Sequence, residues 1–150
     1  MTIQLDVQIV SEYSDIPGEA DFGKWAKAVP CKDETSACLR VVDELEAKNL
    51  NKLYRNIDKA TNVLSFPAEI PSEIGINFLG DIVICAQIVS HEAHEQNKEL
   101  TGHWAHLLVH GLLHLQGYDH EKDHAAEKME TLEIEILKKL HISDPYEKQI

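Results

Sequence analysis

The chain has 150 residues and a formal net charge of −12, which argues against indiscriminate electrostatic binding to nucleic acid. Its length and mixed composition are typical of one globular domain over residues 1–150. No apolar run is long enough to cross a membrane and the start lacks a leader pattern, so we expect a cytoplasmic protein with no membrane partner. Three cysteines without C-x-x-C spacing, Cys31, Cys38 and Cys85, argue against a disulfide framework or a cysteine zinc site.

Hydrophobic periodicity predicts strands in the first half of the chain and helices mostly in the second. Strands are expected over residues 3–10, 37–42, 61–66 and 79–86, and helices over 21–28, 43–54, 86–97, 101–116 and 122–140. Asp21 and Thr101 are expected as helix N-caps, and Leu45, Leu50 and Leu53 as core contacts of the second helix. This order predicts an α+β fold, with a small mixed β-sheet packed against a helical layer whose central helix is 101–116.

The most informative motif is a set of three histidines between residues 110 and 120. His110 and His114 are four residues apart, so both can point a ring nitrogen at one metal ion from the same face of a helix. Gly117 suits a chain reversal after the helix, which would return His120 toward the pair. Structural zinc sites normally use four protein ligands. Three imidazoles therefore predict one zinc ion with an open position for water or substrate.

The spacing H-x-x-x-H-x-x-G-x-x-H is also that of the metzincin proteases, with one difference. Gly111 stands where those enzymes carry the glutamate that acts as general base on the zinc-bound water. Ordinary metzincin proteolysis therefore lacks its proton acceptor in this chain.

Other histidines compete for the metal. His103 and His106 extend the stripe of His110 and His114 along the same helix, and spacing alone permits a pair formed by His106 and His110. That pair would lie one turn farther from the reversal at Gly117, where His120 would have difficulty reaching it. The remaining spaced pairs lack an obvious third ligand and are interpreted as solvated: His91 with His94, and His120 with His124.

A local cationic stripe contrasts with the acidic balance of the chain. It consists of Lys48, Lys52, Arg55 and Lys59, spaced so that the helical part of the run carries its cations on one side. Most of the acid lies in the C-terminal third. Such an uneven field can guide an anionic substrate, although a solvated helix face explains the stripe equally well.

Beyond spacing, the sequence resembles a known family. Residues 110–120 match the H-G-x-L-H-L-x-G-Y-D-H signature of the YbeY family of bacterial endoribonucleases, also called rRNA maturation factors. Further segments resemble the family in its order: residues 50–55 (L-N-x-x-Y-R), 61–67 (T-N-V-L-S-F-P) and 79–84 (L-G-D-I-V-I). Asn62 departs from the commonest pattern, in which many members have Asp, so no catalytic role is assigned to position 62.

The resemblance implies a YbeY-like metal-dependent hydrolase domain: a zinc-dependent endoribonuclease specific for single strands. Its implied roles are maturation of the small-subunit (16S) rRNA 3′ end and ribosome quality control, with RNA and the ribosome or its small subunit as partners. His110, His114 and His120 would bind the metal, and Arg55 would stabilise charge on the phosphate. Arg55 could instead be a structural ion-pair partner of Asp58 or Asp81.

Two other functions stay open. One is a metallohydrolase acting on a different substrate, such as a peptide or a small phosphoester. The other is a ribosome-associated assembly factor whose metal is structural. Asp119 is expected to accept a hydrogen bond from a metal-bound imidazole rather than to bind the metal itself.

Overall fold

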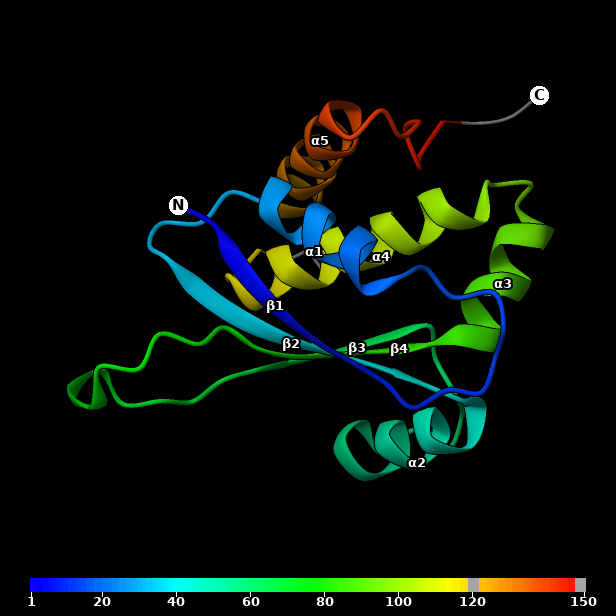
Figure 1. Ribbon diagram of the computed structural model, residues 1–150, viewed down its shortest axis with the longest axis horizontal. Helices are drawn as coiled ribbons and strands as arrows, with labels where there is room; N and C mark the ends of the chain where they lie inside the picture. The colour runs from blue at the N-terminus through cyan, green and yellow to red at the C-terminus, as the bar shows by residue number, and fades with distance from the viewer. Residues whose placement is uncertain (119–121, 148–150) are drawn as a thin grey trace.

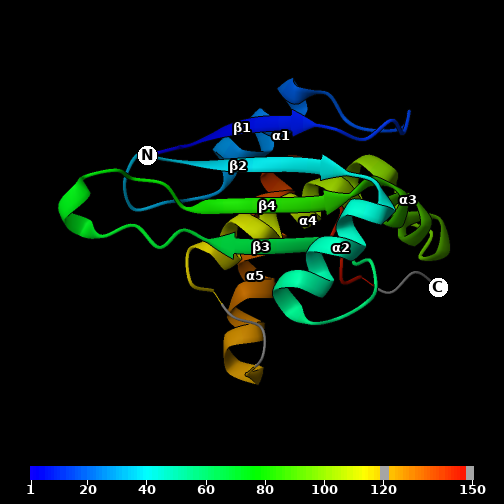
Figure 2. The same cartoon turned by 90° about the horizontal axis from the view of Figure 1, so that it is seen from below.

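A four-stranded mixed sheet organises the protein. The computed structural model describes residues 1–118 and 122–147, apart from the Ser72 side chain. The strands are β1 (Ile3–Ile9), β2 (Thr35–Val42), β3 (Val63–Pro67) and β4 (Gly80–Cys85), in the order β1-β2-β4-β3. β1, β2 and β4 run parallel, whereas β3 pairs antiparallel with β4 and forms one edge (Figure 2). The predicted small mixed sheet is confirmed.

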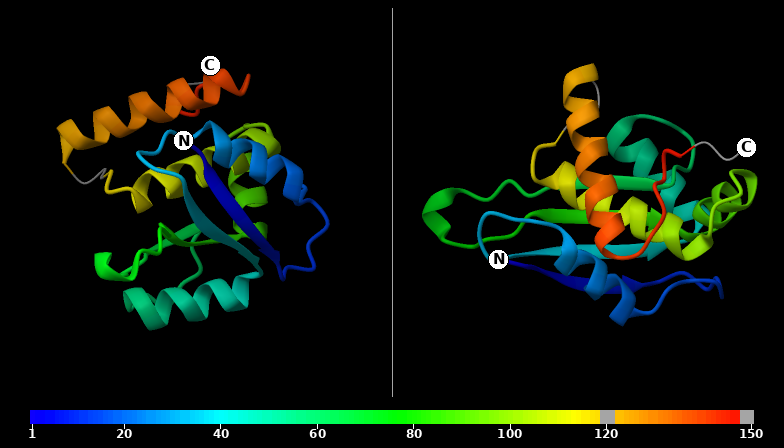
Figure 3. Two further views of the ribbon diagram at one scale, coloured as in Figure 1. Left: turned by 60° about the vertical axis from the view of Figure 1, so that its left-hand side comes forward. Right: turned by 90° about the horizontal axis from the view of Figure 1, so that it is seen from above.

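Helices cover both faces of this sheet. They are α1 (Glu19–Ala28), α2 (Glu44–Arg55), α3 (Ala86–Glu95), α4 (Leu100–Leu115) and α5 (Asp123–Lys139). α1 and α4 lie on one face and α2 lies on the other (Figure 1). α5 packs on the side of α4 that faces away from the sheet (Figure 3). α4 is therefore enclosed between the sheet and α5, as the expected central helix.

The main core lies between α4 and the sheet. Alternating residues of β2 point into it because successive strand side chains face opposite sides, and Leu39 and Val41 are fully buried there. α4 contributes Trp104, Leu108 and Leu112, which are also fully buried. These apolar contacts fix α4 rigidly, and α4 carries the histidine stripe.

Some sequence predictions about helix faces and caps are wrong. Leu45 and Leu53 are 72% and 73% exposed, because α2 covers only one end of the sheet (Figure 2) and turns a different face inward, with Ala47 buried and Leu50 partly buried.

The expected N-caps also differ. Asp21 lies inside the first turn of α1 after Gly18, and Thr101 lies inside α4 after Glu99, with no side-chain cap at either helix.

The connection from β3 to β4 contains a short 3-10 helix, Ser72–Ile74, and projects beyond the sheet (Figure 1). Among the residues that the structure describes, no helix is both long enough and apolar enough to span a bilayer.

Candidate metal centre

The C-terminus of α4 ends in the reversal that the sequence predicted. Gly117 has φ +96°, a conformation that glycine adopts without the steric cost of a side chain. Its N–H donates to the carbonyl of His114 (3.0 Å), and the N–H of Tyr118 donates to the carbonyl of Leu113 (3.2 Å). This pair of bonds is a Schellman motif, which turns the chain back beside the last turn of the helix.

The reversal also fixes the proton of the His114 ring. Nδ1 of His114 lies 3.2 Å from the carbonyl oxygen of Tyr118. A carbonyl oxygen can only accept a hydrogen bond, so Nδ1 carries the proton and donates it. In the neutral ring the lone pair is then on Nε2, the form in which imidazole binds a metal.

His110 is oriented in the same way by a carboxylate. Its Nδ1 lies 2.8 Å from Oε1 of Glu133, which α5 places against α4. The rings of His110 and His114 are nearly parallel, with planes 5° apart and centroids 6.4 Å apart. Both rings therefore carry their metal-binding lone pair on the same nitrogen, and this arrangement suits two ligands of one ion. The third predicted ligand, His120, and the predicted acceptor Asp119 lie outside the described residues.

Glu133 is the centre of a buried hydrogen-bond cluster that the sequence analysis missed. It is 0% exposed. It accepts hydrogen bonds from Nδ1 of His110, from Nε2 of His106 at 2.8 Å and from the hydroxyl of Tyr146 at 2.5 Å. Burial acts to raise the pKa of Glu133, but these bonds more than offset it and lower the pKa to about 2. The carboxylate is therefore ionised at neutral pH.

His106, His110 and Glu133 also form a candidate metal cluster, because one ligand atom of each lies within 4.8 Å of the others. The structure thus brings together the alternative pair His106 and His110, with a carboxylate that spacing along α4 could not reveal. Burial lowers the pKa of His106, which keeps that ring neutral beside the ionised carboxylate. The described residues therefore offer two ways to use His110, either with His114 or with His106.

His103 belongs to a separate network. Its Nε2 lies 3.0 Å from Oε1 of Glu92, which also accepts a hydrogen bond from the side-chain amide of Asn62 at 3.1 Å. Asn62, the residue that departs from the family pattern, therefore donates to a carboxylate. An Asp at that position could not do so when ionised.

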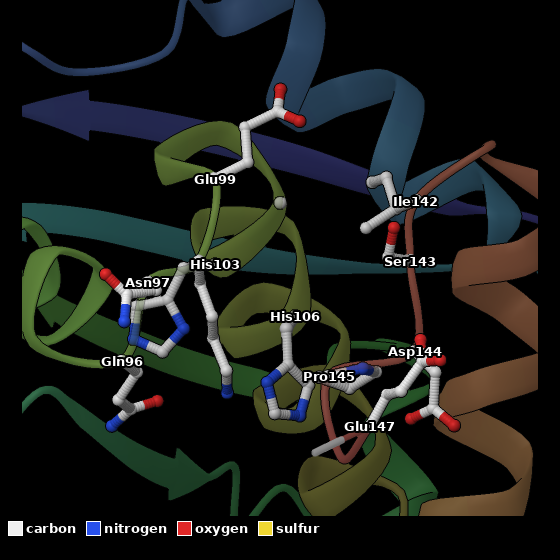
Figure 4. Close-up of a pocket in the computed structure, with 12 residues that line it drawn as sticks. Gln96, Asn97, Glu99, His103, His106, Ile142, Ser143, Asp144, Pro145 and Glu147 are labelled. Atoms are coloured by element: carbon white, nitrogen blue, oxygen red, sulfur yellow. The ribbon is translucent and has the colours of Figure 1, made fainter. Parts of the chain in front are cut away.

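His103 and His106 line a pocket of about 240 Å³ between the start of α4 and the C-terminal segment. Their rings project from α4 toward this pocket, and Ser143, Asp144 and Pro145 close its other side (Figure 4). Of the histidines interpreted as solvated, His91, His94 and His124 are exposed, and His91 pairs with Glu95. His120 lies outside the described residues.

Close packing explains why glycine occupies position 111. A Cβ atom built on Gly111 would lie 3.0 Å from Cδ1 of Ile82, which is fully buried in β4. The position that carries a glutamate in metzincins here faces the sheet rather than an open site. No side chain at residue 111 can therefore act as a base on a metal-bound water.

Substitution of Gly111 tests this packing. Gly111→Ala should cost about 1–3 kcal/mol in overpacking, offset by about 1 kcal/mol of improved helix propensity. Gly111→Glu should destabilise the fold by several kcal/mol, because it also buries an unpaired carboxylate. Denaturant unfolding measures both free energies. A Gly111→Glu protein as stable as the wild type would show that residue 111 does not pack against the sheet.

Arg55 is held at the edge of the sheet by β3. Its Nη2 donates to the backbone carbonyl of Ser65 at 2.8 Å, and its guanidinium lies 5.5 Å from the centre of the Phe66 ring. Among the described residues it pairs with neither Asp58 nor Asp81; Lys48 is the partner of Asp58, at 3.7 Å. The ion-pair alternative for Arg55 is therefore not supported. α4 packs against β3 from the other face of the sheet.

The predicted cationic stripe is only partly helical. Lys48, Lys52 and Arg55 lie on α2, but the helix ends at Arg55 and Asn56 adopts a left-handed conformation, so Lys59 follows in a loop. Three of the four cations thus share the helix.

Together these features define an α+β protein with an oriented histidine pair and a glycine-based chain reversal at the end of a buried helix. The chain matches the sequence model of the family described as Endoribonuclease YbeY over residues 18–141, and it belongs to that family. It is also similar to the solution structure of TM1509 from Thermotoga maritima, with 25% identity and a TM-score of 0.51. That match covers 95% of this chain and 99% of TM1509.

Proposed function

We propose that this protein is a zinc-dependent endoribonuclease that cuts single-stranded RNA in maturation of the small-subunit rRNA 3′ end and in ribosome quality control. The family supports RNA cleavage as the activity. The observation that carries the proposal is the orientation of His110 and His114, each of which donates from Nδ1 to an acceptor and so keeps Nε2 as a metal ligand.

In this proposal one zinc ion is held by His110, His114 and His120. When bound, it would supply a Lewis acid for a phosphoryl oxygen and lower the pKa of a coordinated water. Three protein ligands leave room for that chemistry, whereas the alternative cluster around Glu133 is enclosed by α4, α5 and Tyr146.

Arg55 would bind the scissile phosphate. Its anchor on Ser65 and Phe66 restricts the guanidinium to the β3 edge, and its remaining N–H groups suit two phosphate oxygens at once. A strand of RNA that crosses the β3 edge would contact Arg55 from the α2 side and reach toward the α4 side. A fixed cation stabilises charge as it develops on the phosphate.

The structure offers less support for a purely structural metal. Structural zinc commonly substitutes for a hydrophobic core in small domains, which unfold without it. Here α4 is anchored by fully buried Trp104, Leu108 and Leu112. We therefore expect a chelator to remove activity while circular dichroism shows an intact fold.

Matched RNAs test the substrate. Metal-free and zinc-loaded protein should be compared on one labelled RNA, supplied either single-stranded or annealed to its complement. We expect cleavage only by the loaded protein and mainly of the single strand. Equal cleavage by chelated protein, or unfolding on chelation with unchanged ribosome binding, would reject the proposed enzyme.

The cationic stripe gives a separate prediction about binding. Exposed Lys52 and Lys48, which is only weakly engaged by Asp58 at the surface, should contact phosphate. Replacing both with Gln should weaken RNA binding and reduce the slope of log K against log salt by roughly 1–2. Fluorescence anisotropy at several salt concentrations measures this slope. An unchanged slope would identify a solvated helix face.

A further inference from the structure

Glu133 is an unusual residue for a protein interior, because its carboxyl group is fully buried and accepts hydrogen bonds from three side chains. In the described part of the chain its charged-group partners are His106 and His110, with neither lysine nor arginine among them. A buried carboxylate is costly unless its oxygens are satisfied and its charge is balanced. Its oxygens are satisfied by three donors.

The geometry gives Glu133 a specific effect on His110. Oε1 of Glu133 accepts a hydrogen bond from Nδ1 of His110, which holds the proton of the ring on Nδ1 and leaves the lone pair on Nε2. It also fixes the rotation of the ring, since Nδ1 must stay 2.8 Å from Oε1. A metal-bound histidine commonly has such a partner, which orients the ring and increases its basicity.

The C-terminal segment in turn holds Glu133. After α5, His141 adopts a left-handed conformation with φ 62°, and the N–H of Ile142 donates to the carbonyl of Leu137. This reversal returns the chain along α4 until the Tyr146 hydroxyl reaches Oε2 of Glu133. Burial, the hydrogen bond to Glu133 and its charge raise the pKa of Tyr146, so the phenol stays protonated and donates.

We propose that Glu133 is a positioning residue of the metal centre: it orients His110 for zinc, and Tyr146 from the C-terminal segment holds Glu133 in place. This inference rests on the proposed function, in which His110 is a zinc ligand. It extends the site beyond residues 110–120 to α5 and to the segment that follows it. His106 supplies the third hydrogen bond that the Glu133 carboxylate accepts.

The distances favour this role over direct metal binding by Glu133. Two atoms that bind one zinc ion tetrahedrally, each at about 2.0–2.2 Å, lie roughly 3.3–3.5 Å apart. The contacts of Glu133 with His106 and His110 are 2.8 Å, the length of charge-assisted hydrogen bonds. Tyr146 further occupies the oxygen that faces His106.

Zinc affinity measured by chelator competition tests the proposal. Glu133→Leu removes every acceptor at similar volume and should weaken zinc binding about 10–100-fold, the usual effect of losing such a partner. Glu133→Gln keeps one carbonyl acceptor for His110 and should recover part of the loss. Tyr146→Phe should weaken binding a few-fold. The control is Glu135→Gln on the exposed face of the same helix, which should bind zinc as the wild type does.

A second readout separates positioning from general structural support. Nitrogen NMR of the metal-free protein should show His110 protonated at Nδ1 in the wild type and shifted toward Nε2 protonation in Glu133→Leu. The inference would be overturned if Glu133→Leu binds zinc as tightly as the wild type and keeps the His110 proton on Nδ1. If Glu133→Leu does not fold, Tyr146→Phe decides, and wild-type affinity there would overturn it.

Failure of the underlying function would look different. If His106→Ala abolishes zinc binding while His114→Ala retains it, Glu133 is itself a ligand, and both the proposed site and this inference are wrong. If the wild type binds no zinc, the proposed function fails before the role of Glu133 arises.

Discussion

Single replacement of His110, His114 or His120 by alanine is expected to abolish stable zinc binding and RNA cleavage. Each change removes one of the three proposed protein ligands, so the loss of affinity should exceed the roughly 10–100-fold typical of a lost hydrogen-bond partner. The fold should persist, because α4 is anchored by apolar contacts with the sheet. Metal analysis after dialysis, together with circular dichroism, measures both effects.

Two other histidines serve as controls. His91→Ala changes an exposed residue of α3 and should leave zinc binding unaltered. His106→Ala removes one of three donors to Glu133 and should cost at most about tenfold. A complete loss of zinc in His106→Ala, with wild-type content in His114→Ala, would assign the metal to the other end of the stripe.

Replacing Arg55 with alanine is expected to reduce cleavage by on the order of a hundredfold or more, corresponding to a few kcal/mol of transition-state stabilisation. Zinc content should be unchanged, because the contacts of Arg55 within the described residues are with Ser65 and Phe66 of β3 rather than with a histidine. The exposed side chain contributes one hydrogen bond and one cation–π contact, so the free energy of unfolding should fall by about 1 kcal/mol in Arg55→Ala. Single-turnover kinetics on single-stranded RNA measure the rate.

Arg55→Lys is the informative companion. It keeps the charge but not the planar fork, so only part of the rate should return. Full activity in a folded, zinc-loaded Arg55→Ala protein would exclude the proposed role. Loss of the fold together with activity would instead indicate that Arg55 has a structural role through its contacts with Ser65 and Phe66.

The hydrophobic pattern of the sequence predicted where the main strands and helices lie. Strands β1 and β4 and helices α3, α4 and α5 begin and end within a few residues of the predicted bounds. The signals differ, because α5 buries residues at helical spacing whereas β4 is a nearly continuous buried run. The reversal after α4 was also predictable, since Gly117 has a specific conformational role. Pairing between strands was not, because the order β1-β2-β4-β3 depends on contacts far apart in the chain.

The errors have a common origin in tertiary packing. Leu45 and Leu53 have the spacing of core residues, yet α2 meets only part of the sheet and leaves them in solvent. Glu133 carried a usable signal, because it follows Met129 by four residues and precedes Ile136 by three on the buried face of α5. An acidic residue in that register indicates a buried partner. Tyr146 carried none, since it lies beyond the last periodic segment.

Titration of the metal-free protein with zinc, followed by single-turnover cleavage of single-stranded RNA, tests the central claim most directly. We predict that activity of the wild type rises to a plateau at one zinc per chain. His110→Ala, His114→Ala and His120→Ala should stay inactive at that ratio, and His106→Ala should reach the plateau with excess zinc. Full activity without zinc, or a plateau in His114→Ala together with none in His106→Ala, would contradict a catalytic zinc held by His110, His114 and His120.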